Sequence, residues 1–193
     1  IQQNYFKLHA CCLYNHPVLD GVQTLLARER FAAEDVERIK VEAPALATIM
    51  TDPEPENMLA AKFSLPYAVA TAVVHNSTDI TAFYPDRLQD PETLSLARRV
   101  DIAADPDMDL RRYDYPAAKV AVSLKDGRTL TEDVIAHHGD VQNPASREEL
   151  VGKFNFLVQD VLGEMGAARV VETVGYLDAL GDIRELTRLL KGS

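Results

Sequence analysis

Long hydrophobic runs, basic surface charge and nucleotide-binding loops are all missing from this sequence. No apolar run reaches the roughly 18 residues of a membrane span, and no charged segment followed by an apolar one marks a signal peptide. The formal net charge is -10, and so acidic a surface repels phosphate backbones, which argues against nucleic-acid binding. The motifs GxGxxG and GxxxxGK[ST] are absent, so nucleotide binding has no support either.

Cysteine is also scarce, because the chain holds only Cys11 and Cys12, side by side. Neighbouring cysteines rarely bridge each other, since the resulting ring is strained. Two thiols are too few for an iron–sulfur cluster, which takes several cysteine ligands. Unbridged thiols fit a reducing compartment, so we expect a cytoplasmic protein.

What is present suits one well-packed domain: 193 residues, 47% of them hydrophobic. Apolar spacing and capping residues predict helices over 17–28, 57–75 (interrupted by Pro66), 90–98, 146–162, 166–174 and 178–190. Alternating patterns predict strands over 38–43, 100–103, 119–124 and 129–136, the last two joined by a turn at Asp126-Gly127. The order predicts an α+β fold, a two-layer arrangement in which helices cover a small, mostly antiparallel sheet.

The densest group of reactive side chains lies in Lys7–His16, with the sequence KLHACCLYNH. It places a cation, two imidazoles, two thiols and a phenol just before a helix N-terminus, which attracts carboxylates. Periodicity alone favours a plainer explanation, in which Cys11, Cys12 and Tyr14 pack in the core and His16 is an ordinary neighbour of the N-cap. A zinc site from His9, Cys12 and His16 is a further alternative, although the spacing fits no standard finger and no fourth ligand is evident.

A second group surrounds Pro66 in the Ala-rich helix, with the sequence AKFSLPYAVA at 61–70. Proline inside a helix kinks its axis, and such a kink presents a polar residue such as Tyr67 to a cleft. The alternative is that Tyr67 is a core aromatic residue. His137 and His138 follow a predicted strand and precede a glycine, so we expect them at a solvated strand end.

These two groups together resemble the second domain of the MmgE/PrpD family, which includes 2-methylcitrate dehydratase, cis-aconitate decarboxylase and iminodisuccinate epimerase. The resemblance begins at the lysine, cysteine-rich turn and histidine of 7–16 and continues through the segment 61–68. It extends over the Asp-Gly hairpin, the turn at Gly139, Asn143 and Pro144, and a helix containing Lys153-Phe154. Each motif is weak alone, but the five occur in the family's order.

The resemblance implies a cofactor-independent lyase or isomerase, acting on a small di- or tricarboxylate by removing a proton or a group next to a carboxylate. It implies catalytic roles for His16, Tyr67 and Cys12, and substrate binding by Lys7 and Lys62, with no metal. It further implies that residues 1–193 are the C-terminal domain of a homodimeric enzyme. An all-helical N-terminal domain would then be missing, leaving this chain inactive by itself. The alternative function is a non-catalytic interaction module whose Ala-rich helix forms a dimer surface.

Overall fold

The computed structural model describes residues 4–109 and 116–191, and the chain divides into two compact units, Ile1–Pro144 and Ala145–Ser193. The predicted α+β class is confirmed, because the first unit combines a four-stranded sheet with helices. Its helices are α1 (His16–Glu29), α2 (Met58–Phe63), α3 (Leu65–His75), α4 (Pro91–Ala97) and α5 (Pro106–Asp109). Its 3-10 turns are Leu13–Asn15, Ala33–Asp35, Ala45–Ile49 and Ile80–Phe83.

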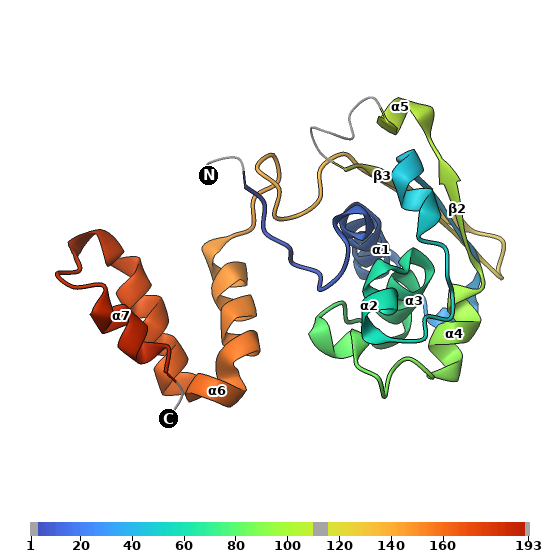
Figure 1. Ribbon diagram of the computed structural model, residues 1–193. Coiled ribbons are helices and arrows are strands. Elements are labelled where there is room, and N and C mark those ends of the chain that lie inside the picture. Colours follow the sequence, from blue (N-terminus) through green and yellow to red (C-terminus); the bar gives the residue numbers. More distant parts are fainter. Residues whose placement is uncertain (1–3, 110–115, 192–193) are drawn as a thin grey trace. The chain divides into compact units, whose positions relative to one another are not determined.

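The sheet has the order β2-β1-β3-β4 (Figure 1). Its strands are β1 (Val36–Ala43), β2 (Val100–Ala104), β3 (Ala118–Leu124) and β4 (Thr129–Val134). Two of the three pairings, β1 with β3 and β3 with β4, are antiparallel, whereas β1 and β2 run parallel. The mostly antiparallel sheet predicted from the sequence is therefore confirmed.

One face of the sheet is buried and the other is solvated. In β1, Ile39, Val41 and Ala43 are buried, and in β3 the same alternation buries Val120 and Val122. Successive side chains of a strand point to opposite faces, so these residues form a single apolar layer. Helices α1 and α3 cover that layer, and α1 contributes its own apolar stripe to the same core (Figure 1). This is the predicted two-layer arrangement.

The Ala-rich segment contains two helices, where the sequence pattern predicts one kinked helix. Ser64 has an extended backbone (φ -80°, ψ 116°) and separates α2 from α3. Its hydroxyl caps α3 by accepting a hydrogen bond from the Tyr67 amide (3.0 Å), and Pro66 occupies the first turn, where a missing N–H costs nothing. Residues 65–73 are all buried, so the expectation of a central helix is confirmed.

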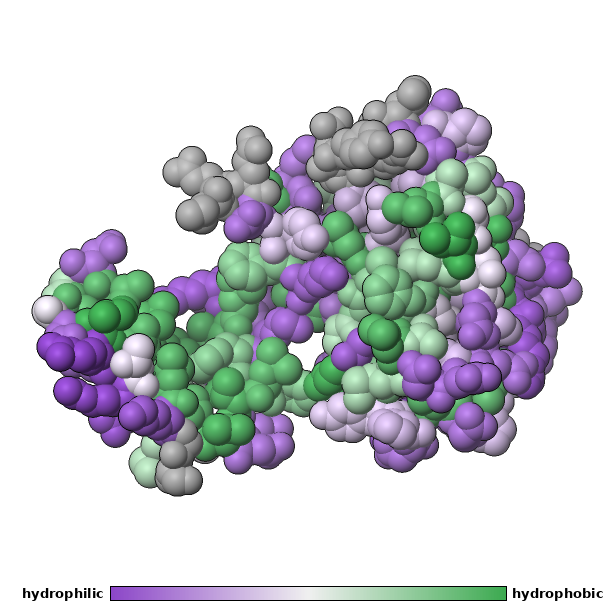
Figure 2. Space-filling view, in the orientation of Figure 1, coloured by the Kyte–Doolittle hydropathy of each residue, from purple (hydrophilic) through white to green (hydrophobic). Residues whose placement is uncertain are grey.

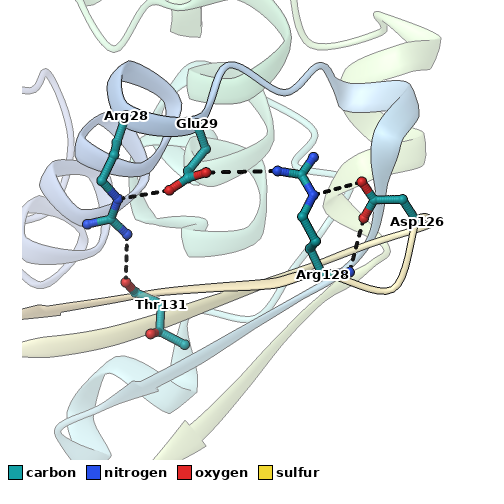
Figure 3. Close-up of polar contacts among 5 residues, drawn as sticks. All are labelled: Arg28, Glu29, Asp126, Arg128 and Thr131. Carbon is teal, nitrogen blue, oxygen red and sulfur yellow. Dashed lines mark hydrogen bonds and ion pairs between the residues drawn. The ribbon is translucent and has the colours of Figure 1, made fainter.

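A surface network fastens the end of α1 to the β3–β4 hairpin (Figure 3). Arg28 bonds Glu29 and the Thr131 carbonyl, and Glu29 also faces the guanidinium of Arg128. Arg128 in turn bonds the Asp126 carboxylate at 2.8 Å across the hairpin turn. These side chains are mostly exposed, so each pair contributes little stability, and the network serves mainly to fix how the hairpin meets α1.

The second unit is a bent helical hairpin. It consists of α6 (Arg147–Gly175), a 3-10 turn (Leu177–Ala179) and α7 (Arg184–Leu189). The predicted capping box opens α6, with Ser146 and Glu149 bonding each other's amides, and Gly163 (φ 61°, ψ 174°) breaks the helix where the sequence predicts its end. Figure 2 shows apolar side chains gathered over this unit, and many of them are exposed, Met165 at 83%. No helix within the described residues is both long and apolar enough to cross a membrane.

Candidate functional site

The segment that carries the predicted site belongs to no helix or strand up to residue 12, and main-chain hydrogen bonds hold it in place. The Phe6 amide donates to the Gly139 carbonyl, the Ala10 amide to Thr78 and the Cys12 amide to Lys62, each at 2.9 Å. The three acceptors lie after β4, after α3 and in α2. The path of the segment is therefore set by three separate parts of the first unit.

Gly139 makes the first of these contacts possible. Its φ is 94°, which is unfavourable for residues with a side chain, and a Cβ atom there would lie 2.3 Å from the Phe6 carbonyl oxygen. The glycine at this turn, one of the motifs behind the family resemblance, thus permits the close approach of the segment that leads to Lys7.

Lys7, Cys12 and Lys62 lie around one turn. Lys7 is exposed and its Nζ donates to the Cys11 carbonyl (3.5 Å), while the carbonyl of Lys62 accepts from the Cys12 amide. Cys12 is half-buried and Cys11 is buried; burial raises the pKa of the Cys11 thiol to about 12, so that thiol stays protonated. The structure therefore brings Lys7, Cys12 and the backbone of Lys62 together at one turn of the first unit.

His16 lies beneath this turn, as the first residue of α1, and is completely buried. Its ring meets those of His9 and His137 edge to face, with centroids 5.0 and 5.2 Å away. Burial, reinforced by the two neighbouring imidazoles, lowers the pKa of His16 to about 2, so the ring is neutral at physiological pH. Within the described residues neither ring nitrogen has a well-aligned hydrogen-bond partner, although the Cys11 backbone lies close enough to act on the ring and raise its pKa slightly against the effect of burial.

The Asp20 carboxylate forms hydrogen bonds with two residues of this histidine cluster. One carboxylate oxygen lies 2.9 Å from His9 Nε2, and the other accepts the His138 amide at 2.6 Å. His9 Nδ1 lies 2.6 Å from the hydroxyl of Thr78. Asp20 follows His16 by one helical turn, so both project from the same face of α1.

Tyr67 sits elsewhere in the core. Its side chain is fully buried, its ring lies against Phe83, and its hydroxyl donates to the Ala82 carbonyl (3.1 Å). Burial raises its pKa to about 12, and the charges that act on it belong to Asp90, Arg87 and Asp86. None of these belongs to the turn of Lys7, Cys12 and Lys62. In this structure the phenol is a hydrogen-bonded core aromatic, the alternative weighed in the sequence analysis.

A groove of about 770 Å³ in the first unit lies between α1, β4 and the turn after it. Its lining includes three carboxylates, from Asp20, Glu132 and Asp133, and neither Lys7 nor Lys62. Such a lining repels a polycarboxylate, so the lysine turn is the better anion-accepting surface. Across residues 4–109 and 116–191, no three His, Cys, Asp or Glu side chains are grouped so that they could hold a metal ion.

Most of the chain matches the model of a known protein family. Residues 9–178 match the model of the MmgE/PrpD C-terminal domain. The chain belongs to the MmgE/PrpD family. The match covers most of the sequence and includes the turn before α1 from residue 9 onward, so Lys7 lies just outside it. It confirms the resemblance inferred from the motifs.

Relatives of this MmgE/PrpD chain include cis-aconitate decarboxylases. The chain is 28% identical over 193 residues to the cis-aconitate decarboxylase of Mus musculus, an alignment that covers 97% of this chain and 39% of the mouse protein. It is 26% identical to the enzymes of that name from Homo sapiens and Aspergillus terreus, with 97% and 95% of this chain and 40% of each relative covered. The chain thus spans about two fifths of the length of the curated relatives it matches.

Sequence reasoning missed part of the histidine cluster. The expectation that His137 lies at a solvated strand end is wrong, because the side chain is 0% exposed and meets the His16 ring edge to face. No local signal marked His137, which reaches His16 through a turn more than a hundred positions away. Asp20 also received no role, although its spacing of four residues from His16 in a predicted helix was a signal that could have found it.

Proposed function

We propose that this chain is the C-terminal α+β domain of a cofactor-independent lyase acting on a small di- or tricarboxylate. The observation that carries the proposal is the turn of Lys7, Cys12 and Lys62, held next to the buried, neutral His16, whose pKa both Lys7 and the Cys11 backbone affect. Membership of the MmgE/PrpD family and similarity to cis-aconitate decarboxylases support it.

The charge pattern fits an anionic substrate. The chain carries a net charge of -10, yet Lys7 lies in this turn and the backbone of Lys62 bonds it, next to the N-terminus of α1. The N-cap residue Asn15 provides no side-chain cap there, so the positive end of the α1 dipole adds to the charge of Lys7. Carboxylate groups of a substrate would be held by Lys7 and Lys62.

The enzyme must stabilise the negative charge that develops at a carbon next to a carboxylate. Removing a proton or CO2 there leaves an enolate-like carboxylate, which preset cations and hydrogen-bond donors stabilise. Lys7 is proposed for this role, because its ammonium group is exposed at the turn. A proton donor and acceptor must flank the reacting carbon.

His16 and Cys12 are the proposed proton-handling groups nearest to that position. Neutral His16 offers one N–H and one lone pair, and within the described residues neither forms a well-aligned hydrogen bond, although the Cys11 backbone lies near the ring. A substrate reaching beneath the turn would supply a better partner. Tyr67 remains a proposed acid, and it acts only if its hydroxyl exchanges the Ala82 carbonyl for the substrate.

The rest of the active site is proposed to come from outside this chain. Because the relatives are about two and a half times longer, we propose a helical domain that closes over the lysine turn, in a homodimeric, cytoplasmic enzyme. The 193-residue chain alone is then expected to turn over little substrate.

The alternative of a non-catalytic interaction module loses its main support. It requires the Ala-rich helix as a dimer surface, but residues 65–73 of that helix are buried within the first unit. Isomerisation remains a chemical alternative to elimination, since both begin with the same enolate.

The decisive experiment uses the full-length enzyme with Lys7→Ala and, as a matched control, Lys125→Ala, an exposed lysine in the hairpin turn. The probes are cis-aconitate and 2-methylcitrate, with products followed by proton NMR. We expect Lys7→Ala to lower kcat/KM by about 100-fold or more, because it removes a preset charge at the enolate. Lys125→Ala should retain wild-type turnover. Undiminished activity in Lys7→Ala, or no turnover of either probe by the wild type, would overturn the proposal.

A further inference from the structure

One carboxylate links the two segments whose histidine rings contact His16. Asp20 bonds the ring of His9 through one oxygen and, through the other, the amide of His138, the residue next to His137. The rings of His9 and His137 are the two that contact His16. The Asp20 side chain is 15% exposed, so these two hydrogen bonds form in a largely desolvated setting.

We propose that Asp20 is a positioning residue that fixes the tautomer of His9 and the place of His137, and through them the surroundings of His16. The inference rests on the proposed function only where it concerns turnover. Asp20 need not touch substrate, because it acts through the two imidazoles.

The tautomer follows from the donors and acceptors. An ionised carboxylate only accepts, so His9 Nε2 must carry the proton that points at Asp20. In neutral His9 the other nitrogen, Nδ1, then has a lone pair, and the Thr78 hydroxyl donates to it. The proton on the ring thus lies on the Asp20 side.

Asp20→Asn reverses this arrangement with almost no change of shape. The His138 amide is a donor at 2.6 Å, so the amide oxygen of Asn must face it. The Asn NH2 group then faces His9 Nε2 and donates to it, which forces the ring proton onto Nδ1, where it is donated to the Thr78 hydroxyl. The opposite orientation of Asn would set its NH2 group against the His138 amide, which places two donors face to face.

The test is imidazole 15N NMR on the 193-residue chain at pH 8, with the His9 signals assigned by their loss in His9→Gln. We expect the Nε2–H pattern for His9 in the wild type and the Nδ1–H pattern in Asp20→Asn. Asp133→Asn, an exposed aspartate of the same groove, is the control for charge and should keep the Nε2–H pattern. Any other pattern in the wild type, or an unchanged pattern in Asp20→Asn, overturns the proposal.

Thr78→Val provides a second variant in case Asp20→Asn does not fold. It removes the partner of Nδ1 but leaves Asp20, so the Nε2–H pattern should persist. A switch to Nδ1–H in this variant would show that Thr78 sets the tautomer, and the proposal would fail.

Measurements of turnover distinguish a failure of this inference from a failure of the proposed function. In the full-length enzyme, Asp20→Asn should lower kcat by about 10- to 100-fold with little change in KM, as expected when a supporting hydrogen bond is lost. A switched tautomer with wild-type kcat would overturn the link from Asp20 to His16. A wild type without activity would remove the proposed function and leave the NMR result standing.

Discussion

The Gly139 turn offers a sharp test of how the site segment is held, because Gly127 provides a natural control. Both glycines have a left-handed backbone, with φ of 94° and 90°. A Cβ atom at Gly139 would lie 2.3 Å from the Phe6 oxygen, whereas one at Gly127 would meet no atom within 4 Å. Gly139→Ala and Gly127→Ala therefore share a conformational cost and differ in the steric one.

The expected magnitudes follow from these contacts. The left-handed conformation costs an alanine about 1 kcal/mol at either position. At Gly139 the two backbones must also separate by about 1 Å to reach ordinary contact, which breaks the hydrogen bond from the Phe6 amide. Repulsion and the lost bond together bring the total to about 3 kcal/mol.

Thermal unfolding followed by circular dichroism measures the difference. For a chain of this size we expect Tm to fall by roughly 6–12 °C in Gly139→Ala and by roughly 2–4 °C in Gly127→Ala. Both residues belong to the first unit, so the same transition reports on both. Equal decreases in the two variants would refute the reasoning, since the contact with Phe6 would then carry no energy.

Two further predictions concern His16 and Tyr67. Because burial lowers the pKa of His16 from 6.5 to about 2, the unfolded chain binds a proton that the folded chain does not, and the free energy of unfolding falls as the pH falls below 6.5. Between pH 7 and pH 5 this group should remove about 2 kcal/mol, so urea melts of His16→Gln should depend less steeply on pH; an unchanged dependence would contradict the assignment. Tyr67→Phe leaves the Ala82 carbonyl without its donor and should lower the free energy of unfolding by about 1–2 kcal/mol, measured by urea denaturation, with a value near zero arguing against that bond.

Local patterns predicted most of the elements. Strict alternation over Lys119–Leu124 and the Asp-Gly turn after it gave the hairpin, and the Ser146 capping box gave the start of α6. These signals depend only on neighbours in the chain. The parallel pairing of β2 with β1 was not predicted, because it joins strands separated by the whole α2–α4 region. The break at Ser64 was missed because a proline can equally kink a helix or begin one.

The candidate site was predictable only where it is local. Lys7, Cys12 and His16 occur within ten residues, so their types and spacing marked the turn directly. The partner imidazole of His137 arrives through tertiary packing, which leaves no trace in a single sequence. The direction of the Tyr67 side chain could not be predicted either. Every face of a central helix is buried, so the neighbours of each side chain depend on how the surrounding elements pack.

Main-chain amides make three of the hydrogen bonds that set the course of the segment before α1. Because the Phe6, Ala10 and Cys12 amides bond regardless of the side chains they carry, substitutions at the intervening positions can alter the chemistry of the turn while its path is retained. A scaffold of this kind can diverge in substrate preference without refolding. Positions 7, 8 and 10 are accordingly where an engineer would vary the turn to change which acid it accepts.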